Sequence, residues 1–222
     1  MRLADSALLR HQCYIDGRWC DADQGTTLQV TDPATGRSLG SVPAMGVAET
    51  RRAVDAAQAA WKPWRALTAA ARGAILRRWQ DLMLAHREDL AQLMTAEQGK
   101  PLAEARAEIQ YAASFVEWFA EEGRRVYGDL IPEHQADKRI LVLKQPIGVC
   151  AAITPWNFPA AMITRKAGAA LAAGCTLVVK PAAETPFSAL ALCELAERAG
   201  LPAGVLNLVT GPARTVGGEL VA

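Results

Sequence analysis

The chain contains the segment Ile153-Thr154-Pro155-Trp156-Asn157-Phe158-Pro159, which ends an apolar run that begins at Val149. A helical pattern over residues 160–173 follows it, and a second apolar run, residues 176–179, ends in Lys180-Pro181. Two strands that are joined by a helix of this length are parallel, with a right-handed connection. We therefore predict an α/β sheet that binds a ligand at the carboxyl ends of its strands.

A third apolar run, residues 205–209, extends the same pattern, with helices predicted over 186–199 and from about Arg214. Asn157, Lys180 and Thr210-Gly211 follow the three strands, so they should meet along one crevice. The chain has neither a G-x-G-x-x-G motif nor a P-loop. A dinucleotide would therefore bind by other means than the common glycine turn.

The amino-terminal part precedes this unit and has two sections. Residues 12–43 alternate short strand-like runs with turn signals, which predicts a small β segment. A helical layer follows, and its predicted helices are Val47–Trp61, Ala69–Met94 and Leu102–Val126. Lys62-Pro63 should end the first of them, and the tryptophans of this layer should pack between helices: Trp61, Trp64, Trp79 and Trp118. Residues 128–147 could form a hairpin that stands away from the body and joins subunits.

The composition is that of a globular protein with a core, because 51% of its 222 residues are hydrophobic and 21% are charged. The net charge of +1 and the dispersed lysines and arginines argue against a nucleic-acid partner. No apolar stretch reaches membrane-spanning length, and the first 16 residues lack a signal-peptide core. The chain has five cysteines, an odd number, and no C-x-x-C pair. This argues against a disulfide framework and favours a cytoplasmic location.

The chain offers no metal site and no evident nucleophile. Three cysteines lie in apolar strand or helix patterns and should be small buried hydrophobic residues: Cys150, Cys175 and Cys193. The three histidines, His11, His86 and His134, are dispersed. We predict no metal ligands among them.

Four segments resemble the aldehyde dehydrogenase superfamily: the 153–159 segment, Ala169-Ala170-Leu171-Ala172-Ala173-Gly174-Cys175, Val178-Val179-Lys180-Pro181 and Glu97-Gln98-Gly99-Lys100-Pro101. Further segments are similar to its succinate-semialdehyde dehydrogenase branch: Met162–Lys166, Thr185–Leu192, and Tyr111–Phe115 with Glu117-Trp118. The resemblance covers nearly the whole chain, with the segments in the family's order.

The resemblance implies an aldehyde dehydrogenase-like α/β fold with an incomplete Rossmann-type parallel sheet. Residues 1–127 would be the β segment and helical layer of the cofactor-binding domain, 128–147 a protruding oligomerisation hairpin, and 148–222 the first part of the sheet. The catalytic domain, with its nucleophilic cysteine and its base glutamate, would lie beyond Ala222. A sheet that stops after three strands should have an unpaired edge, and the isolated chain should behave poorly.

The resemblance also implies a reaction. A cysteine thiolate attacks the aldehyde to form a thiohemiacetal, hydride passes to the nicotinamide, and a glutamate activates water to release the acid. Asn157 is similar to the residue whose side-chain amide donates to the negative oxygen of the tetrahedral species. Judged without the resemblance, Asn157 is better explained as a turn residue before Pro159.

The residues that resemble the family's cofactor contacts are Thr154, Pro155, Trp156, Lys180, Pro181, Ala182, Ala183 and Gly211. Lys180 is similar to the lysine that contacts the adenosine ribose. Members that prefer NAD usually carry a glutamate at the position of Ala183, and its absence here removes a repulsion toward a 2′-phosphate. We therefore favour NADP over NAD, although Glu184 could reach the ribose and favour NAD.

Arg165 is similar to the group that binds the distal carboxylate of the substrate, and a planar guanidinium suits that role. It could instead be a surface cation beside Lys166. The implied substrate is succinate semialdehyde or a similar short semialdehyde acid, and the implied assembly is a homo-oligomer, a dimer or a tetramer. The alternative is a short non-catalytic protein that at most binds nucleotide or oligomerises through the hairpin.

Overall fold

The computed structural model describes residues 1–222, and a five-stranded sheet lies at its centre. Its strand order is β2-β1-β9-β8-β7. The bounds are Cys13–Ile15 for β1, Arg18–Cys20 for β2, Val149–Ile153 for β7, Thr176–Lys180 for β8 and Leu206–Leu208 for β9. The strands β7, β8 and β9 are parallel, which confirms the predicted unit. Strands β1 and β2 of the predicted amino-terminal β segment extend this sheet, because β1 pairs antiparallel with β9 and with β2.

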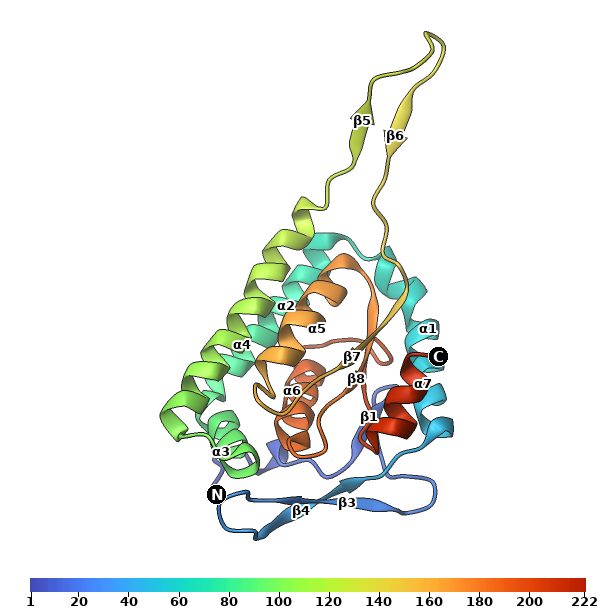
Figure 1. Ribbon diagram of the computed structural model, residues 1–222. Coiled ribbons are helices and arrows are strands. Elements are labelled where there is room, and N and C mark those ends of the chain that lie inside the picture. The colour runs from blue at the N-terminus through green and yellow to red at the C-terminus, as the bar shows by residue number, and fades with distance from the viewer.

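Helices cover both faces of this sheet (Figure 1). The helices that follow the parallel strands are α5 Ala161–Ala173, α6 Pro186–Arg198, a π-helical turn Ala213–Gly217 and α7 Gly218–Leu220. The long helix α1, Val47–Ala66, packs on the face opposite α5 and α6. Gly174 ends α5 with a φ of 92°, a conformation that glycine adopts without strain.

An outer layer of helices stacks on α5 and α6. Its members are α2 Ala69–Ala85, α3 Arg87–Gln98 and α4 Leu102–Glu122. Trp64 and Trp79 are buried, and their indole N–H groups donate to the carbonyls of Leu171 and Leu192 at 3.2 and 3.0 Å. Trp118, expected to pack between helices, is instead 62% exposed on α4. The packing prediction therefore holds for two of the tryptophans, and Trp61 is half-buried.

The first helix continues past Pro63, contrary to the prediction that Lys62-Pro63 would end it. Proline removes one helical hydrogen bond, here the bond to the carbonyl of Ala59. Both Pro63 and Ala59 are exposed, so water can satisfy that carbonyl. Trp64, buried one position later, holds the last turn against α5. Tertiary packing thus overrides the proline signal.

The other two predicted helices also end differently. The pattern over 69–94 is two helices, because His86 has a non-helical backbone between α2 and α3. The third helix stops at Glu122 and is followed by a 3-10 turn, Gly123–Arg125. At the break, Asp89 accepts the backbone N–H groups of Ala4 and Asp5 at 2.8 and 2.9 Å. The amino-terminal tail therefore packs where α3 begins.

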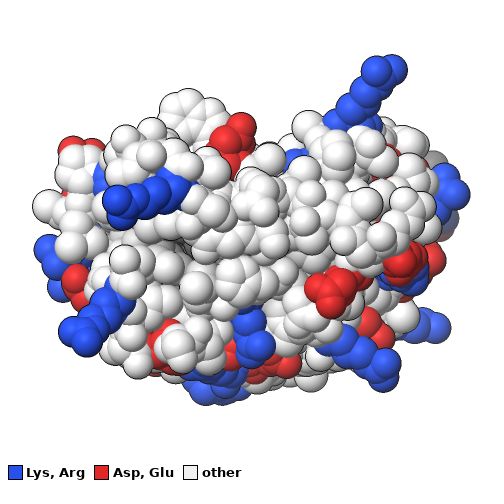
Figure 2. All heavy atoms as spheres, turned by 90° about the horizontal axis from the view of Figure 1, so that it is seen from below, with Lys and Arg blue, Asp and Glu red and all other residues white.

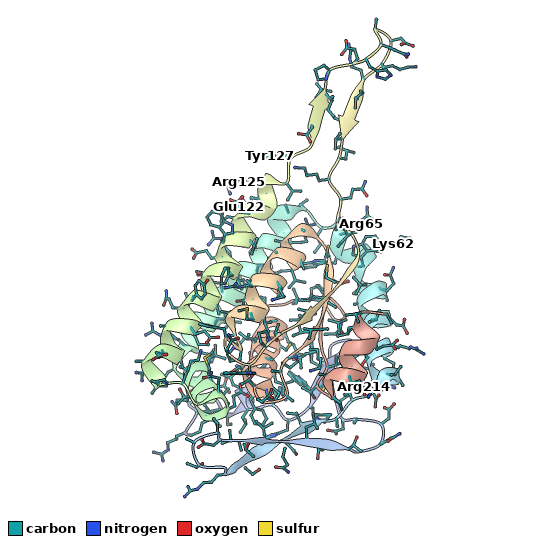
Figure 3. The ribbon with its side chains drawn as sticks, in the orientation of Figure 1. Lys62, Arg65, Glu122, Arg125, Tyr127 and Arg214 are labelled. Carbon is teal, nitrogen blue, oxygen red and sulfur yellow. The ribbon has the colours of Figure 1, made fainter.

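Two ribbons lie outside the central sheet. The strands β3 Thr27–Thr31 and β4 Ser38–Pro43 form one of them, and β5 Asp129–Ile131 and β6 Ile140–Val142 form a hairpin that projects from the body (Figure 1). Figure 3 shows Glu122, Arg125 and Tyr127 below one leg of the hairpin, and Lys62 and Arg65 near the other. Arg65 donates to the side chain of Gln145 at 3.1 Å, which ties the returning leg to α1. No helix in the molecule has the length and apolar character that crossing a membrane requires.

Candidate functional site

The carboxyl ends of β7 and β8 lie side by side. Ile153 pairs with Lys180 in register, and the N–H of Thr154 donates to the carbonyl of Lys180 at 3.0 Å. These ends point toward the side of β3 and β4 in Figure 1, and Figure 2 views the molecule from that side. The view shows uncharged atoms across the middle and charges of both signs around the rim. The strand ends therefore share one edge, as predicted.

Lys180 is the most strongly buried cation of this edge, with 3% of its surface exposed. Its ammonium donates to the carbonyl of Pro181 at 2.9 Å and makes no other hydrogen bond in the chain. Burial lowers the pKa of Lys180, and the nearby carboxylate of Glu184 opposes that shift. An ammonium has three N–H donors, so two remain for a ligand. This arrangement fits the hydroxyl or phosphate oxygens of a nucleotide.

The end of β9 is joined to the end of β4. The N–H of Met45 donates to the carbonyl of Thr210 at 3.0 Å, and the Thr210 hydroxyl donates to the carbonyl of Pro43 at 2.5 Å. Gly211 follows with a φ of 153°, and a Cβ at this position would lie 2.5 Å from the carbonyl oxygen of Met45. Only glycine therefore allows the chain to pass here, which gives Gly211 a structural reason independent of any cofactor.

The turn between β7 and α5 carries Trp156 and Asn157 on the surface. Trp156 is 54% exposed, and Asn157 is exposed as well. The carbonyl oxygen of Asn157 accepts a hydrogen bond from Nζ of Lys100 at 3.0 Å. The side-chain amide of Asn157 makes no hydrogen bond within the chain. It is thus free to donate to a ligand while the backbone that carries it is held.

Lys100 also forms an ion pair with Glu108, and this pair lies inside the protein. The exposed fractions of the two side chains are 10% and 1%. Glu108 Oε1 accepts the backbone N–H groups of Ala160 and Ala161 at 3.0 and 3.2 Å. These groups begin α5, where a carboxylate satisfies unpaired N–H donors and interacts well with the helix dipole. The pair therefore fixes the start of α5 from the outer layer.

The start of α6 is held in a similar way by Glu97. Its two carboxylate oxygens accept the N–H groups of Phe187 and Ser188, both at 2.7 Å. Burial raises the pKa of Glu97 from 4.5 to about 7, against the lowering effect of these hydrogen bonds. The carboxyl lies next to no lysine or arginine within ion-pair distance. Its charge is consequently expensive to bury.

Arg165 lies on α5 against the aromatic side chains of α4. Its Nη2 donates to the hydroxyl of Tyr111 at 3.0 Å, and its guanidinium carbon lies 4.7 Å from the ring centre of Phe115. Nε of Arg165 is buried without a partner. The guanidinium is therefore held against Tyr111 and Phe115 and not against the turn that carries Asn157. The alternative of a freely solvated surface cation fits these contacts poorly.

The cysteines do not have the surroundings of a nucleophile. All five are free, and burial raises the pKa of Cys13 to about 12 and of Cys150 to about 11. A nucleophilic thiol needs the opposite shift. Cys175 and Cys193 are buried as predicted, whereas Cys150 is half-buried. No group of three or more histidine, cysteine or acidic side chains lies close enough to hold a metal ion.

The sequence prediction missed the roles of Lys100, Glu108 and Tyr111 in this arrangement. Lys100 and Tyr111 lie in segments that carried the family resemblance, but no contact was assigned to them. A signal for Glu108 was available, because it lies on the same helical stripe as the buried residues Ala105 and Ala112. A carboxylate on such a stripe needs a buried partner.

Comparison with known proteins shows high similarity over the whole chain. The glutarate-semialdehyde dehydrogenase of Pseudomonas putida is 69% identical over 220 residues, which are 99% of this chain and 46% of that protein. The succinate-semialdehyde dehydrogenase [NADP(+)] GabD of Escherichia coli is 68% identical over 222 residues, 100% of this chain and 46% of that protein. A 3-sulfolactaldehyde dehydrogenase of Pseudomonas putida is 60% identical and covers 99% of this chain and 45% of that protein.

Solved structures agree with these relatives. A crystal structure of an E. coli NADP-dependent enzyme has a TM-score of 0.98 and 68% identity, and the match covers 98% of this chain and 45% of that one. The 3,6-anhydro-L-galactose dehydrogenase in complex with NAP has a TM-score of 0.93 at 41% identity, over 95% of this chain and 44% of that one. PnpE in complex with nicotinamide adenine dinucleotide has the same TM-score, 0.93, at 39% identity, over 95% and 43%.

The chain spans slightly less than half the length of these relatives. The sequence profile of the aldehyde dehydrogenase family matches residues 19–222, which is nearly all of the chain. This match shows that the chain belongs to the aldehyde dehydrogenase family.

Proposed function

We propose that the intact enzyme oxidises a short semialdehyde acid, of which succinate semialdehyde is the first candidate, to the carboxylic acid with NAD(P)+. By intact enzyme we mean this chain continued to the full length of its relatives. The observation that carries the proposal is the guanidinium of Arg165, which is held on Tyr111 and Phe115 with an unpaired buried Nε. Three relatives named for acid-bearing aldehydes support it.

In the proposed reaction, the chain contributes the group that stabilises the negative oxygen. A cysteine thiolate, assigned to the part of the relatives that this chain does not span, adds to the aldehyde carbon to form a thiohemiacetal. The amide of Asn157 donates a hydrogen bond to the oxygen that becomes negative. Loss of one such donor typically lowers turnover by roughly two to three orders of magnitude. A glutamate, also outside this chain, then activates the water that releases the acid.

A bound NAD(P)+ would supply the acceptor for the hydride from the thiohemiacetal carbon. We propose that Lys180 donates to the adenosine ribose or its 2′-phosphate, because two of its N–H groups remain free in a buried position. The backbone of the Thr154–Trp156 segment and of Pro181 to Ala183, with Gly211, would line the rest of the groove.

NADP is the favoured cofactor in this proposal, because Ala183 places no carboxylate next to a 2′-phosphate. Glu184 is exposed and lies close enough to Lys180 to influence its pKa, so it is the competing group. The test is kcat/KM for NADP+ and NAD+ in the intact enzyme and in its Ala183→Glu variant. The variant should lose NADP+ use by about tenfold or more and keep NAD+ use. A strong NAD+ preference before substitution would reject the assignment.

Arg165 is proposed to bind the distal anion of the substrate. Arg165→Ala should raise KM for succinate semialdehyde by about tenfold to a hundredfold and leave the kinetics of butanal nearly unchanged, because an uncharged aldehyde gains nothing from the guanidinium. Lys166→Ala, the neighbouring exposed cation, serves as the matched control. Equal losses for the acid and for butanal in Arg165→Ala would exclude the role.

The substrate itself is tested by comparing kcat/KM for succinate semialdehyde, glutarate semialdehyde and 3-sulfolactaldehyde. Glutarate semialdehyde carries its carboxylate one methylene farther from the aldehyde carbon than succinate semialdehyde does. The 3-sulfolactaldehyde keeps the shorter spacing and has a sulfonate in place of the carboxylate. The ratios therefore compare the span between Arg165 and the reacting centre and the kind of anion that Arg165 accepts. The proposal expects succinate semialdehyde to be preferred. A preference for either of the other two would retain the enzyme class and change the substrate.

A second candidate function is a non-catalytic chain that oligomerises through the hairpin. Its support is the exposed apolar surface of the hairpin, which includes Leu130, Leu141 and Leu143.

We propose that the hairpin joins subunits in the intact enzyme as well, in a dimer or a tetramer. Residues 1–127 and 148–222 are proposed to share one cofactor-binding domain, since β1 pairs with β9. The five free cysteines support a cytoplasmic location. Leu130→Lys/Leu141→Lys should lower the mass of the assembly in sedimentation equilibrium.

A further inference from the structure

The segment Glu97-Gln98-Gly99-Lys100-Pro101 carries part of the family resemblance, and the proposed reaction gives it no task. In the structure its lysine reaches across to the turn between β7 and α5. We propose that Lys100 and Glu108 are positioning residues for the amide of Asn157, an inference that rests on the proposed function. They touch neither the substrate nor the cofactor and act through the backbone of the turn.

The contacts that support this form a continuous chain. Nζ of Lys100 donates to the carbonyl oxygen of Asn157 at 3.0 Å and lies 4.4 Å from the ring centre of Phe158. The same ammonium pairs with Glu108, whose Oε1 accepts the N–H groups of Ala160 and Ala161. The carbonyl of Asn157 and the residues that follow it are thus fixed to one buried ion pair.

The buried location of this ion pair makes it suited to fix the backbone of the turn that carries Asn157. An ion pair inside a protein is screened less by solvent than a surface pair, and its hydrogen bonds to charged groups are the stronger ones. The amide of Asn157 has no partner of its own in the chain, so the position of its backbone sets the region that the amide can reach. A displacement of about 1 Å in a group that acts on the transition state can cost roughly a hundredfold in rate.

The test uses a variant that removes the ammonium and its ion pair but keeps an acceptor for the start of α5. Lys100→Met/Glu108→Gln leaves an amide oxygen to accept the N–H groups of Ala160 and Ala161, and it leaves no unpaired buried charge. The measured quantity is the single-turnover rate of NADPH formation in the intact enzyme at saturating substrate. We expect a fall of about tenfold to a hundredfold, with little change in KM. Lys62→Met, an exposed lysine at the end of α1, is the matched control and should keep the rate.

A mutant cycle with Asn157→Ala separates positioning from a general structural effect. If Lys100 acts through Asn157, adding Lys100→Met/Glu108→Gln to Asn157→Ala should slow the enzyme no further. Faster amide exchange in residues 157–161 should accompany the variant and be absent in Lys62→Met.

Each other result of the cycle overturns the inference. In one such result, Asn157→Ala lowers the rate and its reduction multiplies with that of Lys100→Met/Glu108→Gln. In another, Lys100→Met/Glu108→Gln keeps the rate. In both cases the positioning role is wrong and the proposed function stands. If Asn157→Ala itself leaves the rate unchanged, the role of Asn157 in the proposed function is wrong, and the inference falls with it.

Discussion

The starts of α5 and α6 are built alike and differ in one charge. Neither helix has a side-chain cap of its own, and each receives a buried carboxylate from the outer layer. Glu108 accepts two N–H groups at the start of α5, and Glu97 accepts two at the start of α6. Glu108 is paired with Lys100, whereas Glu97 has hydrogen bonds alone.

That difference separates a helix start with an ion pair from one whose buried carboxylate has no cation beside it. The cation beside Glu108 also reaches the carbonyl of Asn157, so the charge that holds α5 holds the proposed oxyanion donor too. Without a cation, burial raises the pKa of Glu97 to about 7. The comparison predicts a large effect of breaking the ion pair at α5 and a pH-dependent effect at α6.

The largest expected effect is at α5. Glu108→Ala leaves Lys100 as an unpaired buried cation and leaves two N–H groups without an acceptor. Breaking a buried ion pair in this way destabilises a protein by about 3–5 kcal/mol. Urea denaturation of the chain measures the free energy of unfolding. Glu104→Ala, an exposed carboxylate one turn earlier on α4, is the control and should change it by less than about 1 kcal/mol.

The next effect is the pH dependence of α6. The pKa of Glu97 is about 7 in the folded chain and 4.5 as its ordinary value, so folding takes up a proton between these two pH values. Its contribution to the free energy of unfolding is therefore greatest below pH 4.5 and falls by on the order of 3 kcal/mol as the pH rises through 7. Glu97→Gln lacks the titrating group.

The wild-type value minus the Glu97→Gln value should accordingly decrease from pH 4.5 to pH 7 and then stay level. A difference that grows with pH over this window would mean that the hydrogen bonds from Phe187 and Ser188 outweigh burial.

The smallest effect sets the scale for an ordinary helix start. At α2, the hydroxyl of Thr68 accepts the N–H of Ala71 at 3.1 Å, and Thr68 is exposed. Thr68→Ala should cost about 1 kcal/mol without pH dependence. A loss as large as that of Glu108→Ala would show that any disturbance of a helix start is costly here, and the buried ion pair would then have no special weight.

The sequence was sufficient to predict the parallel strands and the helices between them, because each is a long periodic segment with clear ends. Gly174, for example, ends α5 as expected. It was not sufficient where distant contacts override local signals. Pro63 lies within α1 because Trp64 packs on α5, and β1 joins the sheet through a pairing with β9 that no local pattern encodes.

In the candidate site, too, local patterns predict some features and distant contacts determine the others. The position of Asn157 and Lys180 at one edge follows from strand direction alone. The contacts of Lys100 and Glu108 could not be predicted, because they join helix and turn residues about fifty positions apart. A buried carboxylate on the apolar stripe of α4 was a hint that such a partner exists, but the stripe does not identify it.

The most direct test of the whole account is the single-turnover rate of NADPH formation in Asn157→Asp. This change keeps the size of the side chain and replaces a donor by an acceptor that repels a negative oxygen. The account predicts a fall of about a hundredfold to a thousandfold with succinate semialdehyde, with the binding of NADP+ retained. A rate within about twofold of the unaltered enzyme would contradict it, because the edge of the sheet would then hold no oxyanion donor.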